Sequence, residues 1–450
     1  MTPDDSDDLA RFSRMLASGN AAGGPPDARA VEDARRRRRR GRIAGLVVAI
    51  VIVAAIGAYI PATLLAPVDA TTASTHPHEV ATPAPATLAL PHGSEVAVSI
   101  TGGDDFQKLS GSKELLNTSG ANSPLPIASI SKLITSLVIL DAKPLAMGRP
   151  GPTITFSKSD AKLYDKYYVQ QASIEPMDAG TSMSEQDALE TILVASACNY
   201  AEVLSTWAYG SQSRFLAAAK AWLAKNGLTG TRMVEPTGLD ALNVSTPSDL
   251  IALGKIALAN PVVAAIVGSA SVTVPNVGFL SNNNRLVGSN GVTGIKTGTL
   301  AEAGGCLLFS AVVNADGIGQ LTVIGVVLGA ASHESINADV GSFIKSIKAG
   351  FHTINLTVGG DDYGTYTTPW NSKAKLLAGN SASVLVWSNT KVTSTIKTTT
   401  VTEARDGAKV GAVTFVAGSS TITVPLVLEG SISPPSAWWR LTHPLELLGN

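Results

Sequence analysis

The chain has 450 residues, of which 45% are hydrophobic and 15% charged, so it can bury a sizeable core divided between two domains. Its two cysteines are too few for a disulfide framework, and its six histidines show no spacing typical of a metal site. The net charge of -1 conceals a strong asymmetry near the N-terminus.

The N-terminal part divides into a charged tail and an apolar run. Residues 1–42 hold an acidic, Gly- and Pro-containing stretch that predicts disorder, followed by the arginines Arg35 to Arg40 and Arg42. Residues 43–65 are uncharged and reach the ~20-residue length that a transmembrane helix needs. They begin too far from the first residue for an ordinary signal peptide.

The arginine run has two interpretations, a nucleic-acid surface or a signal that holds the N-terminus in the cytoplasm. Its position directly before the apolar run favours the second, under the positive-inside rule. We therefore expect a single-pass cell-membrane protein without a nucleic-acid partner, in which everything after about Pro67 is extracytoplasmic.

Three segments follow the predicted span. Residues 66–91 are rich in Pro, Thr and Ala and predict an extended linker. Residues 92–350 begin with a predicted strand at Ser94–Ile100 and form the larger domain. Residues 351–450 are rich in Thr, Val and Gly, with alternating apolar runs, and predict a small β-domain.

A first chemical motif is Ser129 with Lys132, three residues apart and therefore on one face of a helix. The chain contains seven Ser-x-x-Lys patterns, but only this one leads straight into a long apolar helix. Burial there favours a neutral amine that can take a proton from a hydroxyl. The alternative is a capped core helix with a lysine that reaches solvent.

Two further stretches stand downstream in a fixed order. A capping pattern at Ser184–Asp187 predicts a helix from Ala188 to about Ala195, which leads to Ser196, Cys198 and Asn199. The stretch 294–299 places a lysine and two threonine hydroxyls on a glycine-edged strand, which predicts a carboxylate-binding site. The runs 306–314 and 319–329 then predict a hairpin, and 332–348 a closing helix.

These motifs resemble the penicillin-recognising serine enzymes, and most of all the D-alanyl-D-alanine carboxypeptidases among the low-molecular-mass penicillin-binding proteins. The resemblance covers residues 92–350 well and the β-domain loosely. It implies an α+β, β-lactamase-like fold, with an antiparallel sheet flanked by helices and an all-helical lobe. The predicted transmembrane helix and small β-domain would be added at either end.

The resemblance also implies roles for the motif residues. Ser129 would be the acylated nucleophile, Lys132 its base, and Ser196 the group that passes the proton to the leaving amine. The remaining positions implied for substrate binding are Lys296, Thr297, Gly298, Thr299, Cys198 and Asn199. The backbone N–H groups of Ser129 and Thr299 would form the oxyanion hole.

One position departs from the family pattern, because Cys198 stands where the middle motif Ser-x-Asn has its amide. A thiol is a poor hydrogen-bond partner, and Asn199 one place later would normally point away, so we expect weakened activity. Cys306 begins the strand that follows the predicted carboxylate-binding stretch 294–299. A Cys198–Cys306 disulfide is a further hypothesis.

The resulting expectation is a membrane-anchored serine carboxypeptidase that trims peptidoglycan stem peptides ending in D-Ala-D-Ala. It would need no cofactor or metal and would be inhibited by β-lactams. The alternatives are a weakly active or inactive wall-binding pseudoenzyme, favoured by Cys198, and a β-lactamase or DD-endopeptidase.

Overall fold

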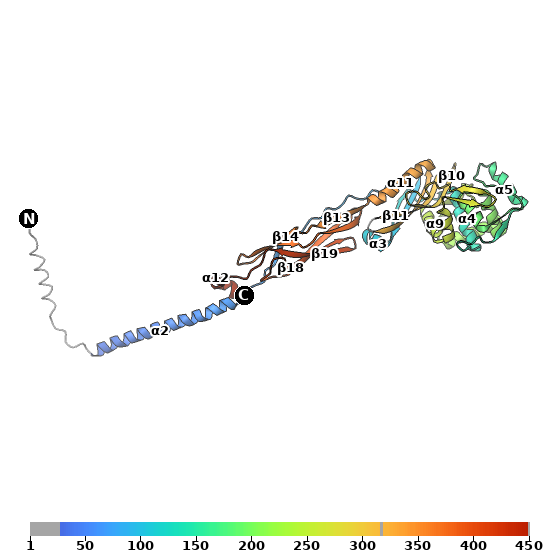
Figure 1. Ribbon diagram of the computed structural model, residues 1–450. Helices are drawn as coiled ribbons and strands as arrows, with labels where there is room; N and C mark the ends of the chain where they lie inside the picture. Colours follow the sequence, from blue (N-terminus) through green and yellow to red (C-terminus); the bar gives the residue numbers. More distant parts are fainter. Residues whose placement is uncertain (1–27, 316–317, 449–450) are drawn as a thin grey trace, which may run out of the picture.

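The computed structural model describes residues 28–315 and 318–448, which form an elongated molecule (Figure 1). A long helix, α2 (Ala28–Leu65), lies at one end, a β-rich part forms the middle, and a mixed α/β domain lies at the far end. The chain returns from the far domain through the β-rich part, so residue 448 lies close to the C-terminal end of α2.

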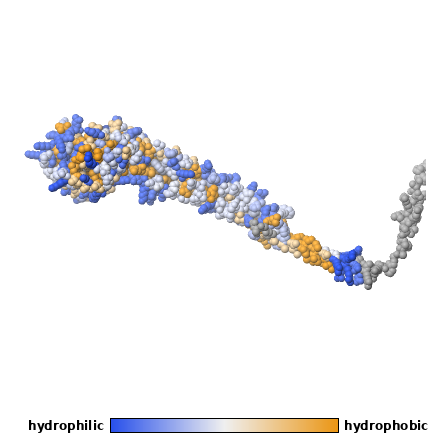
Figure 2. Space-filling view, turned by 180° about the vertical axis from the view of Figure 1, so that it is seen from behind, coloured by the Kyte–Doolittle hydropathy of each residue, from blue (hydrophilic) through white to orange (hydrophobic). Residues whose placement is uncertain are grey.

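Helix α2 contains an apolar stretch that is long enough to cross a membrane. Residues 35–65 qualify by length and composition, and none of their most apolar window is buried in the protein. Figure 2 shows this stretch as a hydrophobic band that lies directly beside the hydrophilic arginines. The predicted apolar helix at 43–65 is therefore present.

The last two helices, α12 (Ala437–Thr442) and α13 (Pro444–Leu448), pack against the C-terminal end of α2. Tyr59 Oη donates a hydrogen bond to the Leu441 carbonyl at 2.7 Å, and the Arg440 guanidinium donates to the Ala66 carbonyl at 2.6 Å. Trp439 packs edge-on against Trp370 of the β-rich part. The C-terminal helices are thus tied to the C-terminal end of α2, where that helix meets the β-rich part.

The β-rich part consists of a six-stranded antiparallel sheet and a two-stranded one, with an apolar core between them. The order in the large sheet is β1-β14-β15-β19-β18-β17, and the small sheet pairs β13 with β16. The strands are β13 (Phe351–Thr357), β14 (Asp362–Thr367), β15 (Lys373–Ala378), β16 (Ala382–Trp387), β17 (Val392–Thr398), β18 (Lys409–Ala417) and β19 (Ser420–Glu429). Burial alternates along β18 and β19, which is the period of a strand with one face in a core.

The segment 66–91 runs along this β-rich part. Its strand β1 (Ala73–Thr75) pairs with β14 and places Ala73 opposite Tyr366. Farther on, the Ala86 amide donates to Ser388 Oγ and the Ala89 amide to Ser346 Oγ. The Pro- and Thr-rich stretch predicted as a linker is therefore held against the β-rich part and, at Ala89, against α11 (His333–Ala349) of the far domain.

The far domain is built around a five-stranded antiparallel sheet of order β10-β11-β12-β2-β3, in which β10 lies at an edge. Its strands are β2 (Glu95–Gly102), β3 (Glu114–Ser119), β10 (Val292–Leu300), β11 (Gly304–Ala315) and β12 (Gly319–Ala330). Neighbouring residues enter different cores, since Leu308 packs with helix α9 (Pro247–Ala259) and Leu307 with helix α11 (His333–Ala349). The two helices therefore cover opposite faces of the sheet.

The face with α9 also carries the helical lobe. Its central helix, α4 (Ser131–Ala142), is buried along ten consecutive residues, Ser131–Leu140. The other members are α5 (Lys158–Tyr168), α6 (Glu185–Leu193), α7 (Cys198–Tyr209), α8 (Gln212–Lys225) and α10 (Pro261–Val267). Short pieces complete the domain: α3 (Asp104–Ser110), η1 (Ala128–Ile130), β4 (Leu125–Pro126), β5 (Thr153–Thr155), β6 (Ser182–Ser184), β7 (Val244–Ser245), β8 (Ser271–Val274) and β9 (Gly278–Ser281).

This architecture confirms the predicted α+β fold, with an antiparallel sheet flanked by helices and a separate helical lobe. The predicted first strand, the β11–β12 pair and the closing helix are present within two residues of their expected bounds. The predicted capping box at Ser184 and Asp187 opens α6 as expected.

A buried acid in α6 predicts a pH-dependent stability. Glu185 has no exposed surface, and neither carboxylate oxygen has a hydrogen-bond partner among the described residues. Burial raises its pKa to about 7 despite an opposing effect of Lys143. An unfolded glutamate ionises at about pH 4.3. As the pH rises from there to about 7, the unfolded state loses its proton while the folded state keeps it. The free energy of unfolding therefore falls with rising pH, by roughly 3 kcal/mol in all.

We therefore expect Glu185→Gln to remove most of the stability difference between about pH 5 and about pH 8. Thermal unfolding of the full chain in detergent at both pH values measures it. Glu190→Gln, on the same helix, is the matched control and should leave the difference in place. An unchanged difference in Glu185→Gln would mean that this carboxyl is not the source.

Candidate active site

Ser129 lies in the short helix η1 (Ala128–Ile130), directly before α4. Ala128 and Ile130 are buried, while Ser129 keeps part of its surface exposed. Two glycines lie against this turn from other elements. A Cβ on Gly298 of β10 would lie 3.0 Å from the Ser129 amide nitrogen, and one on Gly238 would lie 1.9 Å from the Ala128 carbonyl oxygen. The backbone around Ser129 is thus enclosed on two sides.

Lys132 brings its amine to the Ser129 hydroxyl. Its side chain is fully buried, and Nζ lies 2.9 Å from Ser129 Oγ and 2.6 Å from the Thr237 carbonyl oxygen. The three-residue spacing, which spans the junction of η1 and α4, produces the first contact, as the sequence predicts. The second contact comes from a residue 105 positions away and fixes the amine beside the hydroxyl.

The loop that carries Thr237 is organised by Glu235. The Glu235 carboxylate accepts hydrogen bonds from the amides of Thr237 and Gly238, at 2.6 and 2.5 Å, and from Asn243 Nδ2 at 2.9 Å. Thr135 of α4 donates to the Pro236 carbonyl at 2.7 Å. Because the carboxylate is satisfied by these donors, it acts as a support that aims the Thr237 carbonyl at Lys132.

Lys296 approaches the same region from the edge strand β10. It is 1% exposed, and its Nζ donates to the Thr297 carbonyl at 3.2 Å. Alternation along the strand directs Lys296 and Gly298 toward Ser129, and Thr297 and Thr299 toward α11. Burial and the nearby Lys132 lower the pKa of Lys296 to about 7.

Two buried lysines therefore lie close together, and neither forms an ion pair with a carboxylate in the described part of the chain. A buried positive charge without a partner is costly, so a negative charge placed between these two lysines would stabilise the site. An anionic ligand group at this point would supply it.

The lowered pKa of Lys296 predicts how affinity for an anionic substrate changes with pH. Lys296 is charged below about pH 7 and neutral above it, so kcat/KM for a substrate with a free carboxylate should fall as pH rises through about 7. A kcat/KM profile measures this, because it reports the free enzyme. Lys296→Arg keeps its charge, so its kcat/KM should no longer fall as the pH rises through about 7. If the fall persists in Lys296→Arg, a group other than Lys296 causes it.

The middle motif, which begins at Ser196, agrees only partly with the prediction. Ser196 is buried, with a positive φ of 66°, in the connection between α6 and α7. Among the described residues its hydroxyl has no hydrogen bond to Ser129 or Lys132. The chain around it is fixed by the neighbouring loop, since the Asn283 amide donates to the Val194 carbonyl and Asn283 Nδ2 to the Ala195 carbonyl.

Cys198 and Asn199 face different ways. Asn199 Nδ2 donates to the Glu175 carbonyl at 2.8 Å, and Asn199 Oδ1 accepts from the Glu175 amide, so this side chain serves the protein interior. The Cys198 thiol lies near enough to Lys296 to act on its pKa. Asn199 therefore does not take the place of the missing amide, and a thiol occupies that side of the site.

The Cys198–Cys306 disulfide is not present. Both cysteines are buried and free. Cys306 Sγ instead lies 3.6 Å from the Ala303 carbonyl oxygen and 3.8 Å from that of Pro126, and burial raises its pKa to about 11. The two thiols are built into separate packing environments, which the sequence could not reveal.

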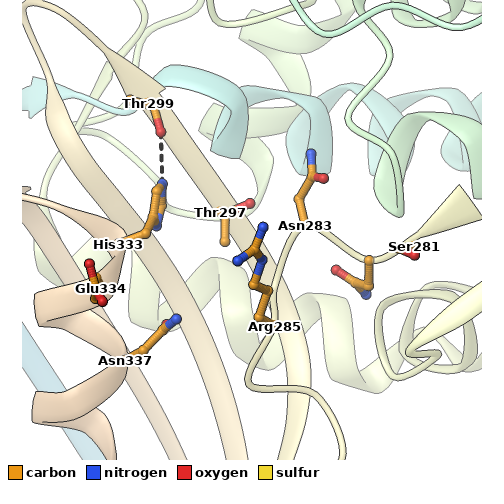
Figure 3. A pocket seen from close by; sticks show the side chains of 9 residues that line it. Ser281, Asn283, Arg285, Thr297, Thr299, His333, Glu334 and Asn337 are labelled. Carbon is orange, nitrogen blue, oxygen red and sulfur yellow. Dashed lines mark hydrogen bonds between the residues drawn. The ribbon is translucent and has the colours of Figure 1, made fainter.

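His333 is a site residue that the sequence analysis missed. It opens α11, and its Nε2 lies 2.7 Å from Thr299 Oγ1 (Figure 3). Its pKa is lowered by burial and by Lys296, against a hydrogen bond with the Gly298 backbone. The only available signal was its place directly after the predicted hairpin.

A cavity of about 750 Å³ opens beside Thr297 and Thr299. It lies between the loop that precedes β10 and the first turns of α11, and Figure 3 shows the side chains around it. The lining residues are Ser281, Asn282, Asn283, Arg285, Thr297, Thr299, His333, Glu334 and Asn337. The lining is polar, which suits a hydrophilic peptide.

Comparison with known proteins places these motifs in a family. The sequence model of a family described as D-alanyl-D-alanine carboxypeptidase matches residues 110–332. A D-alanyl-D-alanine endopeptidase of Pseudomonas aeruginosa is 31% identical over 198 residues, which cover 42% of this chain and 60% of that protein. A D-alanyl-D-alanine carboxypeptidase of Bacillus subtilis is 27% identical over 50% of this chain and 57% of its own length. The chain thus spans about 60% of the length of these relatives.

The fold agrees with this match. The crystal structure of penicillin-binding protein 5 from Haemophilus influenzae superposes with a TM-score of 0.50 and 19% identity, over 76% of this chain and 99% of that one. A penicillin-binding protein 3 from Streptococcus pneumoniae also gives 0.50, with 21% identity over 77% of this chain and 100% of that one. Through residues 110–332, the chain belongs to the D-alanyl-D-alanine carboxypeptidase family of serine DD-peptidases.

Proposed function

We propose that this protein is a membrane-anchored, extracytoplasmic serine carboxypeptidase that removes the terminal D-alanine from peptidoglycan stem peptides. The observation that carries the proposal is the contact of 2.9 Å between the buried Lys132 amine and the partly buried Ser129 hydroxyl. A nucleophile and base at this distance, with the base held by a third group, form the arrangement that activates a serine.

In the proposed reaction, Ser129 Oγ attacks the carbonyl carbon between the two D-alanines, and Lys132 takes the hydroxyl proton. The backbone N–H groups of Ser129 and Thr299 stabilise the oxyanion. The C–N bond then breaks as the proton passes by way of Ser196 to the leaving amine. Water hydrolyses the ester on Ser129 and returns the proton. A β-lactam would acylate the same oxygen and inhibit the enzyme.

The terminal carboxylate would bind at the β10 edge. Lys296 supplies the charge, and the hydroxyls of Thr297 and Thr299 supply directed donors. His333 would hold Thr299 in place from α11, at 2.7 Å. The missing negative charge between the two lysines supports an anionic substrate group at this point.

Membrane attachment is proposed through the apolar part of α2. The arginines before it favour a cytoplasmic N-terminus, which would place the catalytic domain outside, next to the cell wall. The β-rich part lies between α2 and the far domain and would hold the active site away from the membrane surface (Figure 1).

A pseudoenzyme is the second candidate, because Cys198 replaces an amide. The intact Ser129–Lys132 contact and the supported Thr237 carbonyl favour an active enzyme, although a slower one. A β-lactamase would need a second base for rapid deacylation, which the sequence does not supply.

The test is release of D-alanine from a soluble peptide ending in D-Ala-D-Ala by the full chain in detergent. We expect release that stops in Ser129→Ala and in the presence of penicillin. A folded protein that binds penicillin on Ser129 but releases no D-alanine would instead support the pseudoenzyme.

A further inference from the structure

The part of α2 that precedes the apolar stretch carries a dense positive charge. Seven arginines, Arg35–Arg40 and Arg42, stand within eight residues, and all of them are exposed. Arg36 forms an ion pair with Glu32 at 3.9 Å, but the two side chains are 70% and 68% exposed, so the pair is weak. Within the described residues, the other six have no ion pair and no side-chain hydrogen bond. Their charge is therefore available to a partner.

The arginines surround the helix rather than forming a stripe on one side. Successive residues of an α-helix are turned by ~100°, so the six from Arg35 to Arg40 pass through more than one and a half turns within ~8 Å of the helix axis. Their side chains therefore extend from every side of α2. We call Arg35–Arg40 the arginine ring; Figure 2 shows one face of it as the hydrophilic band beside the hydrophobic one.

The arginine ring lies at a fixed level relative to the apolar stretch. Helix α2 runs without a break from Ala28 to Leu65, and the apolar run begins at Ile43, three residues after the ring. With this run in the hydrocarbon core of a membrane, the ring lies among the lipid headgroups, where long arginine side chains keep their charge in contact with water. Lipid phosphates lie at the same level.

The other end of the apolar stretch has a different character. The last turn of α2 contains no basic residue, and Thr63 is fully buried there. Arg440 lies beside it, but its guanidinium donates a hydrogen bond to the Ala66 carbonyl at 2.6 Å. The two ends of the span thus differ in charge, and the arginine ring lies on the cytoplasmic side in the proposed orientation.

We propose that the arginine ring binds the phosphate groups of anionic phospholipids in the cytoplasmic leaflet and gathers several of these lipids around α2. The inference rests on the membrane attachment in the proposed function. A guanidinium holds a phosphate with two parallel donors, and an anionic lipid, unlike phosphatidylcholine, has no cationic headgroup that offsets this attraction. Lipid phosphates surround the ring on all sides, whereas a nucleic acid would reach the arginines from one side only. A lipid partner therefore satisfies more of the ring.

The test uses the full chain in nanodiscs of phosphatidylcholine with a minor fraction of phosphatidylglycerol. Native mass spectrometry counts the lipids of each kind that stay on the protein. We expect wild type to enrich phosphatidylglycerol about tenfold over its share of the disc, because several arginines act together. Replacing all six residues, Arg35→Gln through Arg40→Gln, should reduce the enrichment to within about twofold. Glutamine is as good a helix former as arginine, so α2 persists in this version.

The matched control carries lysine at the same six positions, Arg35→Lys through Arg40→Lys. It keeps the charge, so it should keep most of the enrichment. Equal lipid counts in wild type and the glutamine version would overturn the inference. A short RNA that binds wild type in these discs, but not the glutamine version, would also overturn it, because the ring would then serve a nucleic acid.

Release of D-alanine separates this inference from the proposed activity. The arginine ring lies on α2, at the opposite end of the molecule from α4 and the preceding Ser129 (Figure 1). The glutamine version in detergent should therefore release D-alanine at the wild-type rate. Failure of wild type to release D-alanine would contradict the proposed activity alone, and absence of the lipid enrichment in wild type would overturn the inference alone.

Discussion

Replacing Lys132 by methionine is expected to slow acylation of Ser129 by penicillin about 10³-fold, the usual contribution of a positioned general base. Lys132 Nζ is the group within hydrogen-bond distance of Ser129 Oγ, and it is held there by the Thr237 carbonyl. Methionine fills a similar volume but cannot take the proton. Stopped-flow or quenched labelling with a fluorescent penicillin measures the rate constant.

Lys143→Met is the matched control, because Lys143 directly follows α4 and stacks over Trp207 rather than reaching the site. It should acylate at the wild-type rate. If Lys132→Met acylates normally while folded, another base acts on Ser129 and the assignment of Lys132 is wrong. Thermal unfolding of both variants separates lost chemistry from lost structure.

Replacing Gly238 by alanine is expected to lower the free energy of unfolding by roughly 2–4 kcal/mol and to abolish rapid acylation. Gly238 has a φ of +85°, which L-residues rarely adopt, and its added Cβ would lie 1.9 Å from Ala128 O and 2.9 Å from Ser129 N. Those atoms are backbone, so relief requires moving the turn that carries Ser129 or the loop that carries Thr237. Either movement disturbs the contact between Lys132 and Ser129.

Gly180→Ala isolates the backbone part of this effect. Gly180 has a similar φ of +89°, but its Cβ would meet nothing within 4 Å. Gly180→Ala should lower the free energy of unfolding by about 1–2 kcal/mol and leave the acylation rate unchanged. Equal stability and acylation in the two variants would show that the contact between Gly238 and the Ser129 turn is unimportant.

Local patterns predicted the parts of this structure that depend on local spacing. The Ser129–Lys132 contact follows from a three-residue helical spacing, and β10 with its following hairpin follows from alternation and turn residues. The fold class followed from the resemblance of these motifs and their order. The α6 capping box was visible because its two members are three residues apart.

Contacts between distant residues were not predictable in this way. Glu235 supports Lys132 through the Thr237 carbonyl, and His333 meets Thr299, yet neither pair has a pattern in the sequence. The direction of Asn199 depends on its bonds to Glu175, 24 residues away. Arg285 was not singled out, because a lone arginine in a loop has no meaning until the cavity around it is known.

The central claim is that Ser129 is the nucleophile of a DD-peptidase. The most direct measurement is labelling of the full chain with penicillin, followed by proteolysis and mass spectrometry of the labelled peptide, with Ser129→Ala beside it. The account predicts a single adduct on Ser129 that is absent from the variant. A folded wild-type protein with no adduct, or an adduct that persists in Ser129→Ala, would contradict it.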